Sequence, residues 1–345
     1  MSRQLALDTI NLKPTSRLAH TEYLSHDALF RKVSGEKELS REVERKFLDA
    51  WGIDFIWSVD DGPVPWHKRG RVTDMGHAVY TEDGRDMRDN HKSPFASPDE
   101  VLSFNAVDEY GLPDFDELVK YYQTTWSEKQ AFFKNQLVTG GYYKTIISGA
   151  TESFGWDMEL MAAADHDAFA KVLQSFAELT LHHNKAWAKT DIEVFIQHDD
   201  MVWTNGPFMN PDFYRKHIFP LYKQLWEPLH EAGKKIMYCC DGTFDMFIDD
   251  LIEAGTDGFI FEPSNNFELF IEKCGQTHCL VGSKVDCRAM TFEGWNAVKQ
   301  QMDDTFALKE SIKAFMWAVG NHIPFNVPLE IAEQYIDYLK ANWNR

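Results

Sequence analysis

Short apolar runs alternate with longer amphipathic stretches through the C-terminal two-thirds of the chain. The apolar runs are nearly continuous and show no clean alternation of period two, which is typical of parallel strands buried on both faces. They predict strands at residues 145–150, 193–198, 235–240, 258–262, 279–285 and 314–319.

The stretches between these runs predict helices. Helical periodicity covers residues 164–188, 243–254, 267–273, 291–306 and 328–342. A further helix opens at Pro211 and is predicted to break or kink at Pro220 and Pro228. Upstream, a helix at 39–51 leads into a seventh apolar run at 54–59, and residues 60–113, richer in Gly, Pro, Asp and His, predict excursion loops with a hairpin.

Repeated strand-then-helix order predicts a parallel sheet with helical crossovers. Seven strands, with an eighth in the loop-rich segment, fit a single (β/α)8 TIM barrel, an α/β fold, better than an open sheet. Residues 1–38 are predicted to form an N-terminal helical extension and residues 39–345 the barrel. No Gly-x-Gly-x-x-Gly or Walker pattern supports a nucleotide-binding fold.

The charge balance excludes some partners. The 345 residues include 35 Lys and Arg against 54 Asp and Glu, a net charge of −19. Such a chain repels phosphate backbones and anionic lipid, so we expect no nucleic-acid and no membrane partner. The chain has no long apolar span and no apolar signal core, so a cytoplasmic protein is expected. Its five cysteines, clustered between residues 239 and 287, predict free thiols rather than a disulfide framework.

Residues with ionisable or metal-binding side chains lie at the predicted strand ends, where TIM barrels have their active sites. Cys239 and Asp241 alternate on one strand and therefore share a face. With His322 they would supply S, O and N ligands to a catalytic metal that keeps one open position. A core role for Cys239 and a helix-capping role for Asp241 stay open beside this reading.

The acidic pairs and the basic cluster leave similar alternatives. His198, Asp199 and Asp200 end one strand, and adjacent carboxylates point to opposite faces, so one of the two is expected in the cavity. Asp60 reads as a turn residue or as a carboxylate aimed at substrate. Lys68 and Arg69, within Lys-Arg-Gly-Arg, would clamp a substrate anion or lie on a solvated loop. Glu262 and Asn321 end two further strands.

Four motifs in a fixed order carry a family resemblance. They are HDDMVWTNGPFMNPDFYRKHIFPLYKQLW from His198, KIMYCCDG ending at Gly242, GSKVD ending at Asp286, and GNHIPFNVPLE from Gly320. From about residue 39 to the C-terminus the chain resembles the uroporphyrinogen decarboxylase superfamily, which includes the decarboxylase and the corrinoid-dependent methyltransferases. The resemblance implies a (β/α)8 barrel with its ligand pocket at the C-terminal mouth.

The chain departs from both branches of that superfamily. The arginine-rich N-terminal motif that implies tetrapyrrole binding is absent, since Arg3, Arg17, Arg31, Arg41 and Arg45 are scattered. In the thiol-specific methyltransferases, His-x-Cys-Gly and a later Cys imply zinc. Matching on Gly242 places Cys239, Asp241 and either Asn321 or His322 at those ligand positions. Such a set of harder metal ligands suits activation of a substrate oxygen better than capture of a soft thiol.

The leading hypothesis is a methyltransferase that moves a methyl group between a small methylated donor, such as a methoxyarene, and a corrinoid on a separate protein. Cys239, Asp241 and His322 would hold zinc. Asp60, Asp199, Asp200 and Asp241 would be catalytic, with His198, Lys68, Arg69, Glu262 and Asn321 binding substrate. Two alternatives stay open: a decarboxylase, with Asp60 stabilising a protonated pyrrole, and a non-catalytic ligand-binding barrel. Residues 60–113 would cover the mouth, form a homodimer contact or dock the corrinoid protein.

Overall fold

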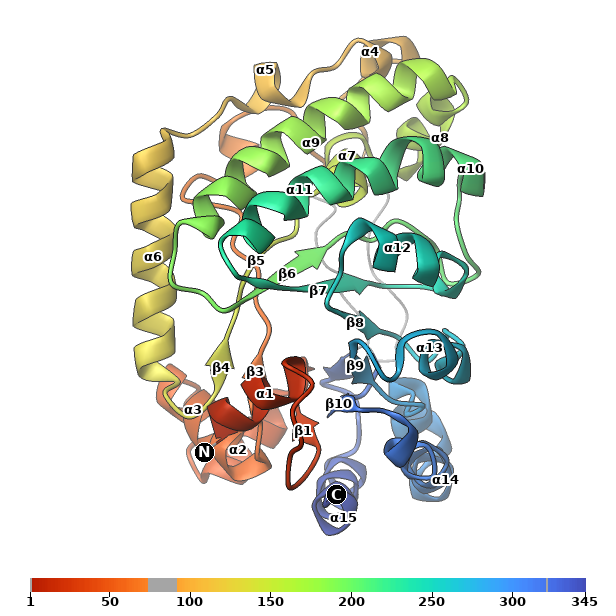
Figure 1. The fold of residues 1–345 in the computed structure, drawn as a ribbon. Coiled ribbons are helices and arrows are strands. Elements are labelled where there is room, and N and C mark those ends of the chain that lie inside the picture. The colour runs from red at the N-terminus through yellow and green to blue at the C-terminus, as the bar shows by residue number, and fades with distance from the viewer. Residues whose placement is uncertain (1, 74–91, 321) are drawn as a thin grey trace.

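Eight parallel strand positions close into a barrel in the computed structural model, which describes residues 2–73, 92–320 and 322–345 (Figure 1). Seven strands form one ladder in the order β1, β10, β9, β8, β7, β6, β5. β4 runs through Thr139 into β5 and pairs with β3, and the N–H of Asp54 donates to the carbonyl of His20 at 2.8 Å to join β3 to β1. The barrel strands are β1 (Ala19–His20), β3 (Phe55–Ile56), β4 (Leu137–Val138), β5 (Gly140–Tyr142), β6 (Val194–His198), β7 (Lys235–Cys240), β8 (Gly258–Phe261), β9 (Cys279–Gly282) and β10 (Ala314–Trp317).

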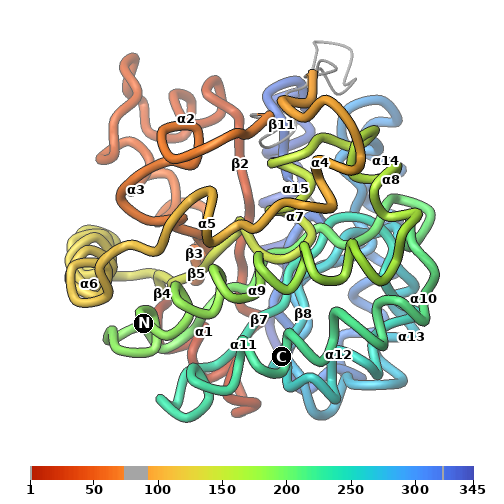
Figure 2. The backbone as a smooth tube through the Cα atoms, turned by 90° about the horizontal axis from the view of Figure 1, so that it is seen from above, coloured from red at the N-terminus to blue at the C-terminus, as the bar shows by residue number. Residues whose placement is uncertain are grey.

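Helices surround the barrel, as the view from above shows (Figure 2). A short parallel pair, β2 (Leu24–Ser25) with β11 (Ile323–Pro324), extends beyond β1 and β10. The helices are α1 (Ser2–Ile10), α2 (Asp27–Ser34), α3 (Arg41–Trp51), α4 (Pro98–Leu102), α5 (Ala106–Tyr110), α6 (Phe115–Phe132), α7 (Ile146–Phe154), α8 (Trp156–Ala163), α9 (His166–Ala188), α10 (Pro211–Phe213), α11 (Phe219–Glu231), α12 (Ile248–Ala254), α13 (Phe267–Cys274), α14 (Trp295–Phe306) and α15 (Leu329–Asn342). None of the helices in the described part of the chain is both long and apolar enough to cross a lipid bilayer.

The barrel interior is a packed apolar core closed at one end. Side chains such as Phe55, Ile196 and Met237 point inward and are fully buried. Ala6 and Ile10 of α1 belong to the same cluster. The N-terminal helix therefore covers the N-terminal end of the strands and leaves the opposite mouth for ligands.

The C-terminal two-thirds follow the sequence predictions closely. β6 to β10 lie within the predicted runs, and α9, α13, α14 and α15 fall where periodicity places them. The proline-rich helix breaks just before Pro220: residues 214–218 form a wider π-type turn between α10 and α11, and Pro220 lies in the first turn of α11. The break predicted at Pro228 is wrong, because Pro228 lies inside α11, which continues to Glu231. All five cysteines are free thiols.

The strand predicted at residues 145–150 is wrong, because these residues begin α7. Ile146 and Ile147 are β-branched and buried, as strand residues often are, but the carboxylate of Asp199 accepts from the N–H of Ile147 and so caps the first turn of the helix. The actual strand, at 137–142, contains Gly140 and Gly141. A Cβ at Gly141 would lie 2.5 Å from the carbonyl oxygen of Ser58, so close packing of β5 requires glycine there.

The eighth strand also lies elsewhere than predicted. The described parts of the loop-rich segment, 60–73 and 92–113, contain no strand and form α4, α5 and a turn of 3₁₀ helix at Trp66–Lys68. The missing strand is β1, so residues expected to form an N-terminal extension contribute to the barrel sheet. β1 has only two residues, too few to produce a periodic signal.

Candidate functional site

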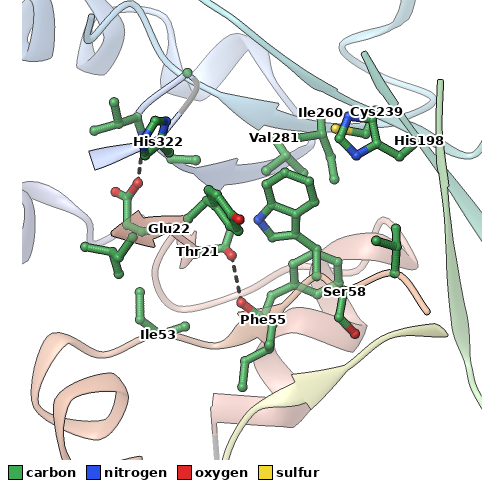
Figure 3. Close-up of a pocket in the computed structure, with 18 of the residues that line it drawn as sticks. Thr21, Glu22, Ile53, Phe55, Ser58, His198, Cys239, Ile260, Val281 and His322 are labelled. Atoms are coloured by element: carbon green, nitrogen blue, oxygen red, sulfur yellow. Dashed lines mark hydrogen bonds between the residues drawn. The ribbon is translucent and has the colours of Figure 1, made fainter. Parts of the chain in front are cut away.

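A cavity of about 420 Å³ opens at the C-terminal mouth of the barrel (Figure 3). Its wall combines carboxylates, two histidines, two buried cysteines and several aromatic rings. The lining residues that carry the argument below are Glu22, Tyr23, Glu44, Trp57, Lys129, His198, Cys239, Asp241, Ile260, Glu262, Val281 and His322. Lys129 is the only Lys or Arg among the described lining residues, and burial lowers the pKa of its ammonium. The cavity is therefore poor in fixed positive charge.

Strand register explains which side chains form the floor of the cavity. His198 is paired with Cys239, Cys239 with Ile260, and Ile260 with Val281 on successive strands. Because side chains two residues apart share a face, the next inward positions towards solvent are Asp200, Asp241 and Glu262. A floor formed by an imidazole, a thiol and two apolar side chains thus lies below three carboxylates.

His198 and Asp200 form the centre of this ring. The Nε2 atom of His198 lies 3.1 Å from Oδ1 of Asp200, and the same oxygen accepts from the N–H of Asp241 at 2.9 Å. Oδ2 of Asp200 accepts from the hydroxyl of Tyr143 at 3.1 Å. His198 also forms a hydrogen bond with the Cys239 thiol. The Asp200 carboxylate is therefore held in one orientation by three donors from three elements.

The electrostatics follow from burial and pairing. Burial disfavours the charged imidazolium, but Cys239 and Asp200 outweigh it and raise the pKa of His198 well above its usual 6.5. Burial likewise disfavours the Asp200 carboxylate, yet His198 and the hydrogen bonds to it lower the pKa of Asp200 to about 2. Burial raises the pKa of the Cys239 thiol. At neutral pH the Asp200 carboxylate is therefore ionised beside His198.

One group of metal-ligating side chains lies at the cavity, where His198 and Asp241 belong to the lining and Asp200 lies next to them. His198, Asp200 and Asp241 each offer a ligand atom, and these atoms all lie within 4.8 Å of one another; this is the only such group among the described residues. The set expected from the sequence, Cys239, Asp241 and His322, does not come together in this way. Figure 3 shows Cys239 beside His198, whereas His322 lies on the opposite side of the cavity near Glu22. Asn321, the other late candidate, lies outside the described residues.

Asp199 lies outside the cavity, on the helix side of β6. Its carboxylate accepts from the N–H groups of Ile147 and Ser148 at 3.0 and 2.7 Å and from the hydroxyl of Tyr222 at 2.7 Å. The side chain is fully buried, and burial raises its pKa. Of the two adjacent aspartates, Asp200 is the one at the site, and Asp199 anchors α7 against β6.

The remaining candidates lie apart from the cavity lining. Asp60 is half-buried and accepts from the N–H of Gly62 at 2.9 Å, and burial raises its pKa. Arg69 donates to the carbonyls of Tyr110 and Gly111, and Lys68 is exposed on the loop. Neither cation lines the cavity. The basic cluster therefore supports the loop fold rather than a substrate anion.

Sequence reasoning missed several residues at the mouth. Glu22 comes from the segment after β1, and its carboxylate accepts from the N–H of Val319 at 2.9 Å and lies 3.1 Å from Nε2 of His20. Trp57 lies 6.0 Å from the His198 ring, between ring centroids. Tyr143 follows β5, a strand that was predicted at the wrong place. Correct placement of that strand would have put Tyr143 at a strand end.

A closed parallel barrel with its polar cluster at the carboxyl ends of the strands has the architecture of a TIM-barrel protein with a mouth-facing ligand site. The chain belongs to the uroporphyrinogen decarboxylase (URO-D) family, whose sequence profile matches residues 146–341, more than half of the chain. The superfamily resemblance predicted from the four motifs is thereby confirmed. No curated protein sequence matches the chain.

Two solved structures match most of this chain. A methyltransferase from Methanosarcina mazei is similar over 99% of this chain and 98% of its own, with a TM-score of 0.69 and 13% sequence identity. A D-allulose 3-epimerase from Methylomonas sp. matches 95% of this chain and 100% of its own, with a TM-score of 0.43 and 11% identity. At 13% identity the first likeness establishes a common fold along almost the whole chain.

Proposed function

We propose that this protein is a methyltransferase that moves a methyl group between a small methylated donor, with methoxyarenes as leading candidates, and a corrinoid held by a partner protein. Family membership and the fold shared with a methyltransferase support the class of reaction. The single observation that carries the choice within the family is the charge of the cavity.

Carboxylates dominate the charged groups of that cavity. Glu22, Glu44, Asp241 and Glu262 line it, against Lys129 as the one described lining Lys or Arg. A substrate with many carboxylates, such as uroporphyrinogen, would meet repulsion there without arginines to bind it. A neutral aromatic ether meets no such repulsion, and the rings of Tyr23 and Trp57, 5.5 Å apart, offer it apolar contact.

Transfer from an ether breaks the bond between oxygen and the methyl carbon. A reduced corrinoid would supply the electron pair for the new bond to carbon, and the departing oxygen would keep the pair from the broken bond and take up a proton. The task of this chain is to hold the ether with its oxygen beside the polar cluster and its methyl group towards the mouth. The polar cluster of His198, Asp200 and Asp241 would stabilise that oxygen through the proton or the cation that it holds, because carboxylates alone repel a departing anion.

The test is incubation of the protein with a cob(I)alamin carrier and a panel of methoxyarenes, followed by the absorbance of methylcobalamin. The proposal expects methylcobalamin with at least one donor, and a loss of more than about 100-fold in rate for Asp241→Asn, the size typical of removing one transition-state contact. Turnover of uroporphyrinogen without any methyl transfer would replace the proposal with a decarboxylase. Ligand-induced stabilisation without any turnover would identify a binding barrel.

A further inference from the structure

We propose that the barrel mouth holds a divalent metal of the zinc type through His198, Asp200 and Asp241, with Cys239 outside the coordination shell. Only Asp241 is kept from the ligand positions that the superfamily motif implies, which are Cys239, Asp241 and His322. The ligands other than Asp241 would come from the end of β6 instead of from β7 and the segment after β10.

The first support is the geometry of the cluster. Two ligand atoms about 2.0–2.1 Å from one ion, at tetrahedral or octahedral angles, lie about 2.9–3.4 Å apart. Nε2 of His198 and Oδ1 of Asp200 are 3.1 Å apart, within that range. The ligand atom of Asp241 lies within 4.8 Å of both, on an exposed residue at the same mouth.

The second support is the set of groups behind the ligands. The hydroxyl of Tyr143 and the N–H of Asp241 both donate to Asp200, and the Cys239 thiol hydrogen-bonds to His198. Metal-binding sites typically fix their ligands through such outer contacts. Cys239 therefore occupies the position of a supporting residue for His198.

The third support is access. His198 and Asp241 line the cavity, so an ion between them faces the space where a substrate binds. Three protein ligands with an open position are the pattern of catalytic rather than structural zinc. A ligand set of one nitrogen and two oxygens favours a substrate oxygen over a thiol as the fourth ligand. The identification of that oxygen as part of an ether or alcohol rests on the proposed methyl transfer.

The experiment measures metal alone, without methyl donor or corrinoid. The full chain is stripped with a chelator and titrated with Zn²⁺, with elemental analysis of the bound metal, and in parallel with Co²⁺ as a spectroscopic probe. The expected result is one ion per chain and a Co²⁺ spectrum without a thiolate-to-metal charge-transfer band. A folded protein that binds no metal would overturn the proposal, as would a thiolate band.

Variants separate the two ligand sets. Asp241→Asn and Asp200→Asn are expected to weaken Zn²⁺ binding by more than about 100-fold, which exceeds the 10–100-fold typical of outer-shell changes. His322→Gln and Cys239→Ala are expected to retain the ion, with at most such an outer-shell effect. Asp245→Asn removes one charge from the same loop and is the matched control, with unchanged affinity. Loss of metal in His322→Gln but not in Asp200→Asn would overturn the assignment. Circular dichroism confirms folding, and Asp241→Asn provides the test if Asp200→Asn does not fold.

This readout is independent of the proposed function. Metal bound as expected without any methyl transfer would leave the site in place and remove the methyltransferase. Methyl transfer by a protein that binds no metal would leave the methyltransferase in place and remove the metal site.

Discussion

The end of β6 has two sides that use the same types of side chain for different purposes. On the cavity side, His198 lines the cavity and Asp200 lies beside it with its side chain 24% exposed. These two residues interact with Cys239 and Asp241. On the helix side, Asp199 is buried between β6 and the helices and holds the first turn of α7. The carboxylates of Asp199 and Asp200 belong to consecutive residues and differ in almost every contact.

The difference shows how a partner of opposite charge decides the state of a buried carboxyl group. Both aspartates lose hydration on folding. At Asp199, backbone N–H groups and a hydroxyl replace part of the lost hydration, but burial still raises the pKa of its carboxyl group. At Asp200, His198 lowers the pKa to about 2. The helix side thus stabilises the fold, and the cavity side keeps a fixed charge available for chemistry.

The largest expected effect separates the two sides by stability. Asp199→Ala leaves buried N–H donors without an acceptor and is expected to lower the free energy of unfolding by about 3–5 kcal/mol. Asp200→Ala also leaves donors without an acceptor, but its side chain is 24% exposed, so it is expected to cost less, about 1–3 kcal/mol. Urea denaturation of both variants measures this, and equal losses would erase the distinction between the sides.

The next effect concerns Glu159 of α8, also on the helix side. Its side chain is fully buried, Oε2 accepts from Thr151 at 2.7 Å, and Oε1 has no hydrogen-bond partner among the described residues. Burial raises its pKa to about 8, so the folded protein keeps a proton that the unfolded chain releases near pH 4.5. Stability from this group is therefore lost as the pH rises between these values, by about 1.4 kcal/mol per pH unit.

Glu159→Gln removes that dependence. Between pH 5 and 7 the wild type is expected to lose about 2–3 kcal/mol more stability than the variant. Denaturation at both pH values measures the difference, and parallel pH profiles would show that Glu159 is not held neutral.

Two tyrosines sharpen the comparison, because each donates to one of the adjacent aspartates. Tyr222→Phe removes the 2.7 Å hydrogen bond to Asp199 and is expected to reduce stability by about 1.5–3 kcal/mol, the usual range for a bond to a charged group. Metal binding and activity of the folded variant should be unchanged. A loss of Zn²⁺ affinity in Tyr222→Phe would show that the helix side also shapes the site.

Tyr143→Phe is the counterpart on the cavity side and the smallest expected effect. It removes the 3.1 Å hydrogen bond to Asp200 and is expected to weaken Zn²⁺ binding by about 10-fold, as outer-shell changes typically do, with little change in stability. Isothermal titration with Zn²⁺ measures the affinity. Destabilisation without an affinity change would place Tyr143 in the fold rather than in the site.

The sequence predicts the second half of this molecule better than the first. Runs such as Lys235–Cys240 are long and apolar, so the positions of β6 to β10, and of Asp200, Asp241 and Glu262 at their ends, follow from the pattern. β1 and β5 are short, and β5 contains Gly140 and Gly141, so neither produces a strand signal. The partners of the site residues were harder to predict: the pairing of His198 with Cys239 depends on strand register, which one sequence does not reveal.

The central claim is that chemistry occurs on the cavity side of β6 and not on its helix side. Formation of methylcobalamin from cob(I)alamin and a methoxyarene, compared in wild type, Asp200→Asn and Asp199→Asn at a temperature where all three are folded, tests it most directly. The account predicts a rate for Asp199→Asn within several-fold of wild type and a loss of more than about 100-fold for Asp200→Asn. Equal losses in both variants, or no methylcobalamin from wild type with any donor, would contradict it.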